Sequence, residues 1–360
     1  MKQQFNENQI KRIVVRGTNW VGDAVMGVPA LRRLRQVFPN AHISLVVRPW
    51  AEGLFADAEF IDALIAYERK SWTSVLEQAR LWREQNFDLA VLFQNDFDAA
   101  LIPFLARVPW RIGYATEGRK ILLSHALALP ARRSSQHEIF YYLNIVREIE
   151  RLLGHAPAAD VAPAYSLKVS EPRQLSAIDK LVGFGANKER ITVALCPGSI
   201  NSRAKRWPAE RYAQLADRLI KEQGADVLLI GSEGERDVAT QVKQHMKHEP
   251  LNLTGKTTLA ETVAILSIVD LVVTNDTGPA HIASSLGRPT LVVFGPTNPL
   301  TTRPYAPSAE IIREPPDCAP CMLRDCPIDH RCMTAISVEQ VYTKAESILR
   351  LAKLATGQSA

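Results

Sequence analysis

Long apolar runs are absent from this sequence. No stretch of about 18 consecutive apolar residues occurs, which excludes a conventional transmembrane helix. Residues 1–12 are polar and contain no apolar core of the kind that a secretory signal peptide carries. Cysteine is also scarce: there are five, and four of them lie close together, a distribution unlike that of a disulfide-stapled secreted fold. These absences predict a cytoplasmic protein.

A strong charge of either sign is missing as well. Lys and Arg number 43 against 38 Asp and Glu, which gives a formal net charge of +5. This mild excess suits an anionic small ligand or an anionic membrane surface, and it does not by itself imply a nucleic acid. With 360 residues, of which 46% are hydrophobic, the chain is long enough to build two sizeable cores.

Short apolar runs alternate with segments of helical periodicity along the chain. In the first half, strands are expected at 13–15, 42–47, 61–65, 89–93 and 111–114, and helices at 24–38, 72–85, 99–105 and 137–153. In the second half, strands are expected at 191–196, 226–230, 271–274 and 290–294, and helices at 208–223, 233–245, 259–267, 280–286 and 338–352. Residues 154–172 lack this alternation and are expected to cross between domains. The pattern predicts two consecutive doubly wound α/β domains.

The turn that follows the predicted strand at 271–274 has the chemistry of an anion site. Asp276 is expected to cap the next helix, whose first N–H groups have no intrahelical partner and carry a partial positive charge. A phosphate would sit over Thr277 and Gly278, and His281, one turn further on, would reach the same anion. The alternative is a plain capped helix in an α/β protein.

The turn after the first strand, from Gly17 to Asp23, is not a Walker loop, because Gly22-Asp23 stands where Gly-Lys-Ser/Thr is required. Asp23 is expected at the carboxyl end of the strand, where open α/β sheets bind their ligands. There it acts either as a helix N-cap or as a general base.

Small residues and cations follow the predicted strand at 191–196. The turn ends in Ser199, and three cations come next, at Arg203, Lys205 and Arg206. Cations beside a turn lined by N–H groups suit a pyrophosphate, although a solvated basic loop is the alternative. Glu233, just after the next predicted strand, is placed to accept hydrogen bonds from ribose hydroxyls, but a glutamate in a first helical turn needs no function.

Two further patterns concern metals. Four cysteines with a histidine among them have a spacing that resembles a zinc knuckle without matching a standard pattern; they are Cys318, Cys321, Cys326, Cys332 and His330. A structural metal, packed reduced thiols and a redox pair are all open. Asp96-Phe-Asp98 is a D-x-D triplet of the kind that some metal-dependent glycosyltransferases use, but it is isolated, and a metal role for it is disfavoured.

Three groups of residues stand at the ends of predicted strands. They are Asn19-Trp-Val-Gly-Asp23, Pro197-Gly-Ser199 with Lys205-Arg-Trp-Pro208, and Asp276-Thr-Gly-Pro-Ala-His281 with Phe294-Gly-Pro-Thr297. Together they resemble the ADP-heptose:lipopolysaccharide heptosyltransferases (glycosyltransferase family 9), and heptosyltransferase II more than I. The resemblance implies a GT-B fold, with Rossmann-like domains at 1–165 and 173–336 facing across a cleft. It also implies a C-terminal helix at 337–360 that packs back on the first domain.

The resemblance further implies an inverting transfer of heptose from ADP-L-glycero-D-manno-heptose to the first heptose of the lipopolysaccharide inner core, with no metal or other cofactor required. Asp23 matches the family's general base and Lys205 its diphosphate-binding, catalytic lysine. The implied donor contacts are Ser199, Lys205, Glu233, Thr257, Asp276, Thr277, Gly278 and His281. The implied acceptor contacts are Asn19, Trp20 and the basic residues Arg111, Arg119, Lys120, Arg132 and Arg133.

A lipid A–Kdo–heptose acceptor implies work at the inner membrane surface, so the expected location is cytoplasmic and peripheral at the inner leaflet. Nucleic acid is not an expected partner. Two alternatives remain. The first is another transferase of the GT-B fold with a different acceptor, including heptosyltransferase I or III. The second is a catalytically inactive nucleotide-binding protein. The presence of both Asp23 and Lys205 argues against the second of these.

Overall fold

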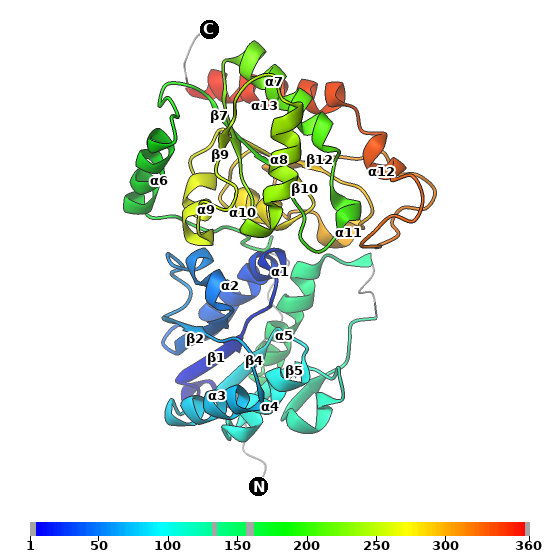
Figure 1. Cartoon of the computed structure of the whole chain (residues 1–360). Coiled ribbons are helices and arrows are strands. Elements are labelled where there is room, and N and C mark those ends of the chain that lie inside the picture. Colours follow the sequence, from blue (N-terminus) through cyan, green and yellow to red (C-terminus); the bar gives the residue numbers. More distant parts are fainter. Residues whose placement is uncertain (1–4, 132–134, 156–161, 357–360) are drawn as a thin grey trace. The chain divides into compact units, whose positions relative to one another are not determined.

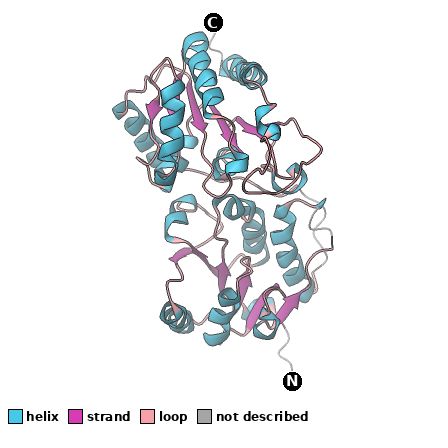
Figure 2. Ribbon diagram, turned by 45° about the vertical axis from the view of Figure 1, so that its right-hand side comes forward, coloured by secondary structure: helices cyan, strands magenta, loops and turns pink. Residues whose placement is uncertain are grey.

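The structure, a computed structural model, describes residues 5–131, 135–155 and 162–356, and it divides into two compact units, Met1–Ser166 and Leu167–Ala360 (Figure 1). The boundary falls inside the predicted crossing at 154–172. Both units are built from a parallel sheet with helices against it (Figure 2). Of the helices in the described part of the chain, none combines the length and the apolar character that a bilayer-spanning helix needs.

The first unit has a six-stranded parallel sheet in the order β3-β2-β1-β4-β5-β6. Its strands are β1 (Arg12–Arg16), β2 (His42–Val47), β3 (Ala63–Ala66), β4 (Leu89–Leu92), β5 (Trp110–Tyr114) and β6 (His125–Leu127). Its helices are η1 (Glu7–Gln9), α1 (Val21–Met26), α2 (Val28–Val37), η2 (Pro49–Leu54), α3 (Trp72–Glu84), α4 (Phe97–Leu105), η3 (Arg119–Leu122) and α5 (Glu138–Leu152). The central strands are buried on both faces, as their continuous apolar runs require.

The second unit repeats this design, with the strand order β12-β11-β10-β7-β8-β9. Its strands are β7 (Thr192–Cys196), β8 (Asp226–Leu229), β9 (Leu251–Asn252), β10 (Leu271–Asn275), β11 (Thr290–Val293) and β12 (Ala309–Ile312). Its helices are α6 (Glu171–Gly183), η5 (Arg203–Lys205), α7 (Ala209–Gln223), η6 (Glu233–Glu235), α8 (Arg236–His245), α9 (Leu259–Leu266), α10 (Gly278–Ser285), α11 (Pro299–Thr302), α12 (Arg331–Thr334) and α13 (Val338–Thr356).

The single helix predicted at 24–38 is two helices in the structure. α1 ends and α2 begins around Gly27, and Pro29 lies in the first turn of α2. Proline has no N–H to donate and its ring disfavours a continuous helix, so the chain restarts at this point. The predicted start of the second domain, residue 173, lies inside α6, which begins at Glu171 with Pro172 in its first turn.

The C-terminal helix contributes to the core of the second unit. Val341, Tyr342, Ala345 and Leu349 of α13 are buried in the core of the second unit, where the helix packs against α7, β10 and β11. The guanidinium of Arg218 lies 3.6 Å from the centroid of the Tyr342 ring. The apolar stripe that predicted the helix therefore completes the core of the second unit.

Each sheet has one point where the direction of strand succession reverses. In the first unit this point lies between β1 and β4, and in the second between β7 and β10. Ligands of open α/β sheets bind outside the carboxyl ends of the strands at such a point. The turns with Asp23, Asp96, Ser199 and Asp276 follow these four strands, whereas Glu233, Thr257 and Thr297 follow their neighbours β8, β9 and β11.

Candidate active site

A lysine and a buried aspartate meet at the reversal point of the second sheet. Lys205 follows β7 in η5, and its Nζ lies 3.0 Å from the main-chain oxygen and 3.1 Å from Oδ2 of Asp276, which follows β10. The same Oδ2 accepts a hydrogen bond of 2.6 Å from the hydroxyl of Thr297. The Asp276 side chain is only 3% exposed and that of Lys205 25%, so the pair is held at the edge of solvent.

This arrangement corrects the predicted helix cap. Asp276 was expected to cap α10, but its carboxylate is engaged by Lys205 and Thr297. Thr277 occupies the cap position, and its hydroxyl lies 3.4 Å from the Asn275 oxygen and from the Thr274 hydroxyl. The Asp276 carboxylate therefore positions the Lys205 ammonium group and does not cap α10.

Asn275 is the residue that sequence reasoning missed. It is fully buried, and its Nδ2 donates to the main-chain oxygens of Pro197 (2.8 Å) and Gly198 (3.2 Å). Its Oδ1 accepts from the Trp207 N–H and the Tyr212 hydroxyl, each at 3.1 Å. One side chain at the end of β10 therefore fixes both ends of the loop that carries Lys205. The only sign of this role in the sequence was a polar residue at the end of a predicted apolar strand.

The start of α10 has the features of an anion site. The helix begins at Gly278, beside Thr277 and within the loop that Asn275 and Asp276 hold. Its first-turn N–H groups and its dipole favour a negative charge, and Lys205 adds a full positive charge at the same edge. His281 lies in the first half of the same helix and is buried, being 4% exposed. The structure thus brings together the predicted donor residues Lys205, Thr277 and Gly278.

The loop after β7 is shaped by the loop after β8. A Cβ on Gly198 would lie 2.1 Å from Oε1 of Glu235, so only glycine fits there. Glu235 is itself fixed, because its Oε2 accepts from the N–H and the hydroxyl of Ser232, both at 2.8 Å. The neighbouring Ser199 is buried, and its main-chain oxygen accepts two hydrogen bonds from the Arg206 guanidinium, at 3.1 and 2.8 Å. Arg206 is thereby assigned to shaping the loop.

Glu233 and the segment that contains Thr257 lie beside one another. A Cβ on Gly255, which has φ +70, would lie 2.5 Å from Oε2 of Glu233. Glu233 is exposed and forms an ion pair of 2.8 Å with Arg236. The Thr257 hydroxyl is 2.9 Å from that of Thr262 in α9. The two residues implied for ribose and adenine therefore belong to adjoining loops at one edge of the sheet.

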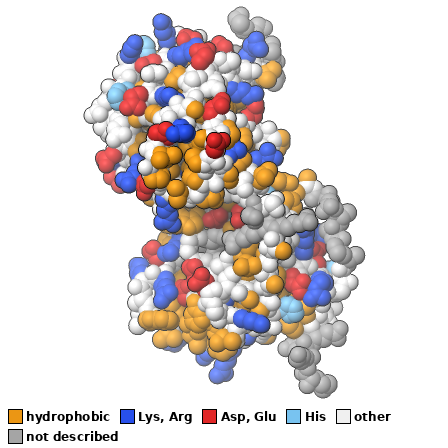
Figure 3. All heavy atoms as spheres, turned by 90° about the vertical axis from the view of Figure 1, so that its right-hand side faces the viewer, with side chains coloured by type: hydrophobic (Ala, Val, Ile, Leu, Met, Phe, Trp, Pro, Cys, Tyr) orange, Lys and Arg blue, Asp and Glu red, His pale blue; other side chains and the backbone are white. Residues whose placement is uncertain are grey.

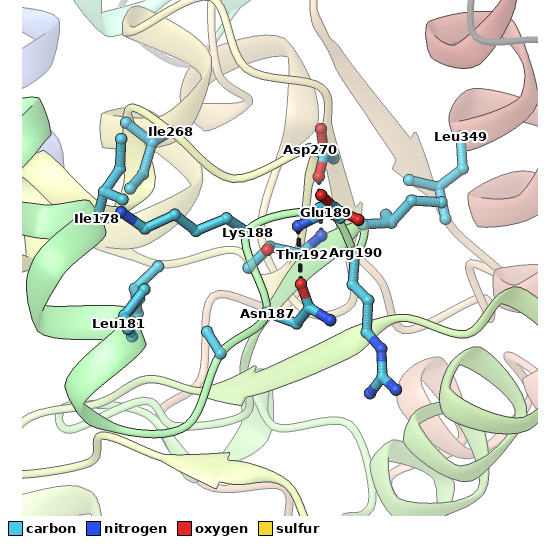
Figure 4. A pocket seen from close by; sticks show the side chains of 13 residues that line it. Ile178, Leu181, Asn187, Lys188, Glu189, Arg190, Thr192, Ile268, Asp270 and Leu349 are labelled. Atoms are coloured by element: carbon cyan, nitrogen blue, oxygen red, sulfur yellow. Dashed lines mark hydrogen bonds between the residues drawn. The ribbon is translucent and has the colours of Figure 1, made fainter.

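A pocket of about 420 Å³ occurs elsewhere in this unit, beside the segments that lead into β7 and β10 (Figure 4). There Oδ2 of Asp270 accepts a hydrogen bond of 2.8 Å from the Thr192 N–H. Asp270 precedes β10 and Thr192 begins β7, so the pocket lies at the amino ends of these strands. It is separate from the edge that carries Lys205 and Asp276.

In the first unit, Asp23 lies within α1, at its third residue, and Trp20 is the residue before the helix. Asp23 is therefore not the N-cap, which removes one of its two predicted roles. It is partly exposed, and Trp20 beside it is 55% exposed. Asn19 joins the neighbouring turns: its Oδ1 accepts from Nε of Arg48 at 3.1 Å, and its Nδ2 lies 3.5 Å from Oδ2 of Asp96.

Two of the predicted acceptor-binding arginines have structural partners. Arg119 is completely buried, and its guanidinium donates to the main-chain oxygens of Tyr114 (2.8 Å) and Gln94 (2.5 Å) and to Oδ1 of Asn95 (3.0 Å). The guanidinium of Arg111 donates to the oxygens of Leu122 (2.7 Å), Val108 (2.5 Å) and Pro109 (3.3 Å). Arg119 is therefore removed from the acceptor site, because it cannot meet a ligand. Lys120 is exposed, and Arg132 and Arg133 lie outside the described residues.

Neither metal pattern forms a ligand cluster in the described residues, where no group of three or more His, Cys, Asp or Glu side chains is arranged to hold an ion. Cys332 is buried, and burial and the neighbouring thiols raise its pKa to about 11, which keeps it protonated at neutral pH. His330 hydrogen-bonds to the Ala204 oxygen at 2.6 Å. Cys318, Cys321 and Cys326 are free thiols at or near the surface. Of the four thiols, only that of Cys332 is packed in the core.

The D-x-D triplet is likewise part of the fold. Oδ2 of Asp96 accepts a hydrogen bond from the amide of Gln94. Burial lowers the pKa of Arg16 to about 10. The negative charge of Asp98, which is also buried, opposes this lowering. A guanidinium with that pKa is still protonated at neutral pH, so Asp98 has a cationic partner.

Comparison with known proteins gives one consistent result. The model of glycosyltransferase family 9 (heptosyltransferase) matches residues 75–331. Lipopolysaccharide heptosyltransferase 2 of Salmonella typhimurium is 32% identical over 316 residues, which cover 84% of this chain and 88% of the relative. Lipooligosaccharide heptosyltransferase 2 of Haemophilus influenzae is 31% identical over 313 residues, with the same coverage. The solved structure of E. coli ADP-heptose LPS heptosyltransferase II superposes with a TM-score of 0.82 at 27% identity, covering 95% of this chain and 99% of that one.

The two doubly wound sheets, with their turns at the reversal points, define a glycosyltransferase of the GT-B fold. The chain belongs to glycosyltransferase family 9, the heptosyltransferase family.

Proposed function

We propose that this enzyme transfers heptose from ADP-L-glycero-D-manno-heptose to the first heptose of the lipopolysaccharide inner core, the reaction of a heptosyltransferase II. The observation that carries the donor side is the Lys205–Asp276 pair beside the first turn of α10, because a cation next to unpaired helix N–H groups suits a diphosphate. The acceptor side is supported by relatives that are about one-third identical over 84% of the chain and bear the name heptosyltransferase 2.

The proposed reaction forms one bond and breaks another. The acceptor hydroxyl attacks the anomeric carbon from the face opposite the leaving group, and the bond from that carbon to the diphosphate oxygen breaks. The electron pair leaves with ADP, whose new negative charge is stabilised by Lys205 and the first-turn N–H groups of α10. Asp23 takes the proton of the attacking hydroxyl. Asp276 and Thr297 act through Lys205, whose ammonium group they hold in place.

A consequence of this chemistry is that no metal is required. The charge that a divalent cation would neutralise is met by Lys205 and by backbone dipoles. Transfer measured in EDTA should match transfer measured without it. Activity that disappears with EDTA and returns with magnesium or manganese would assign the leaving-group role to an ion instead.

The acceptor of the proposed reaction is lipid-linked, so the proposed place of work is the cytoplasmic surface of the inner membrane. The experiment that tests the function offers purified enzyme and ADP-heptose to three acceptors: lipid A–Kdo carrying no heptose, one heptose or two. Transfer to the one-heptose acceptor alone is expected. Transfer to the acceptor without heptose would mean the first reaction of the series, and transfer to the two-heptose acceptor would mean the third.

A further inference from the structure

Helix α4 of the first unit is apolar on its outward side as well as its inward side. The only charged residue among Phe97–Leu105 is Asp98, which is buried. Ala99, Ala100, Ile102 and Pro103 face the core. Phe97, Leu101 and Phe104 recur at helical spacing; the two phenylalanines are exposed, and Leu101 between them is partly buried against the core. A surface helix of a globular domain normally shows polar residues there, so this helix has the composition of one that is covered.

The outward side of α4 continues onto its neighbours. α4 packs against α3 on one flank and η3 on the other, and the guanidinium of Arg83 in α3 donates to the Leu105 oxygen at the end of α4. α3 contributes Trp72 and Leu76, both exposed, and η3 contributes Ile121, which is 83% exposed. We call the set Trp72, Leu76, Phe97, Leu101, Phe104 and Ile121 the apolar face. On the side drawn in Figure 3, hydrophobic side chains gather on the lower part of this unit with Lys and Arg beside them.

Cations surround the apolar face. The guanidinium of Arg69 lies 4.9 Å from the Trp72 ring and that of Arg111 lies 5.5 Å from the Phe104 ring. The other exposed cations of these segments are Lys70, Arg80, Arg83, Arg107 and Lys120. The exposed carboxylates there are Glu68, Glu77, Glu84, Asp96 and Glu117, of which Glu68 pairs with Arg48, Glu84 with Arg80, and Asp96 accepts from Gln94. The rim is therefore cationic on balance, and aromatic rings beside arginines suit a boundary between water and hydrocarbon.

We propose that the apolar face binds the surface of an anionic lipid bilayer, with the side chains of α4, Trp72, Leu76 and Ile121 entering the interface and the cations contacting headgroups. Exposed apolar residues with a basic rim are the composition of an interfacial binding surface. A second copy of the chain fits less well, because symmetric pairing of this face would bring two cationic rims together. The proposal rests on the proposed function in one respect, in that a lipid-linked acceptor gives the enzyme a reason to bind lipid.

The test is sedimentation with vesicles, without substrate. The purified full chain should bind vesicles of phosphatidylethanolamine and phosphatidylglycerol more strongly than vesicles of phosphatidylcholine, and added salt should weaken the binding. The double variant Leu76→Glu/Ile121→Glu should reduce the partition coefficient roughly tenfold or more, since two buried side chains are lost from the interface. Lys70→Gln/Arg80→Gln should reduce it by a smaller factor and flatten the salt dependence.

The matched control is Leu175→Glu, which changes a leucine of similar exposure (54% against 58% for Leu76) on α6 of the other unit. It should bind vesicles as the wild type does. All variants should keep the wild-type melting temperature and the wild-type turnover on a lipid-free acceptor oligosaccharide, which separates this proposal from the proposed function. Unchanged vesicle binding by Leu76→Glu/Ile121→Glu would overturn the proposal. So would a wild-type dimer in analytical ultracentrifugation that this double variant dissociates.

Discussion

The two units have the same strand order and differ in how they hold their functional edge. In the second unit, Asn275 and Asp276 are buried and cross-link the loops that follow β7 and β10. In the first unit, the turn after β1 presents a partly exposed Asp23 and an exposed Trp20. One edge is therefore set before a ligand arrives, as a fixed diphosphate site should be. The other edge presents a partly exposed carboxylate and an exposed aromatic side chain, as the proposed site for a larger and more variable acceptor would.

The largest effect on turnover is expected from a substitution of Asp23, at the functional edge of the first unit. Asp23→Asn removes a base and keeps the shape, so turnover should fall by roughly 10²–10⁴-fold. Because Asp23 lies within the first turn of α1, the lost charge should cost the helix less than about 1 kcal/mol. ADP affinity should stay the same, since the donor residues belong to the second unit. Turnover, melting temperature and ADP affinity measured on one preparation check this; near-normal turnover would leave the reaction without its base.

In the second unit, a substitution of Asn275 should disrupt the loops at the functional edge of the sheet. Asn275→Ala would leave the oxygens of Pro197 and Gly198, the Trp207 N–H and the Tyr212 hydroxyl without their buried partner. A free energy of unfolding lower by about 3 kcal/mol or more is expected from urea titration, because each unpaired group costs roughly 1–3 kcal/mol. Thr262→Ala, which removes the partner in α9 of the Thr257 hydroxyl, is the control and should cost less than about 1 kcal/mol.

Lys205 links stability to donor binding. Lys205→Gln should weaken ADP binding roughly 10–100-fold in calorimetric titration, since charged hydrogen bonds contribute about 1.5–3 kcal/mol each. It should also lower the melting temperature, because Asp276 loses the cation that pairs with its buried carboxylate. Adding Asp276→Asn to this variant should restore the melting temperature without restoring ADP affinity. Restoration of both would mean that Lys205 serves the fold alone.

The smallest effects are expected from two adjacent cations of the first unit, Arg119 and Lys120, to which the structure gives different roles. Arg119→Gln should reduce the free energy of unfolding by about 2 kcal/mol, because three buried acceptors lose their donor. Lys120→Gln should leave stability unchanged and raise the acceptor KM by no more than about threefold, the size of one exposed charge contact. An acceptor KM that rises with Arg119→Gln at unchanged stability would contradict the structural role given to Arg119.

The parts of the fold that depend on local pattern were predictable. The central strands β1, β4, β7 and β10 are continuous apolar runs between turns, and each lies within two residues of its expected position. The edge strands β6, β9 and β12 were not predicted, because they are short and half-exposed and their sequences carry no clear alternation. Their strand conformation comes from pairing with β5, β8 and β11.

The candidate site divides in the same way. Lys205 and Gly278 were found because small residues, cations and a helix start follow strands in the sequence. The role of Asn275 depends on partners 63–78 residues away, so no local pattern could reveal it. Arg119 was expected to meet a ligand because an anionic acceptor should contact basic residues of the first domain. Its burial follows from carbonyl groups that the fold brings together, which lie up to 25 positions away in the chain.

The position of α13 has a consequence for synthesis on the ribosome. Val341, Tyr342, Ala345 and Leu349 complete the core that α7, β10 and β11 begin. Until residues 338–349 leave the exit tunnel, the nascent second unit exposes the apolar surface that these side chains cover. The first unit, whose elements end with α5, is under no such delay. The two halves of the enzyme are thus expected to fold in sequence, with the second awaiting a helix translated long after its sheet.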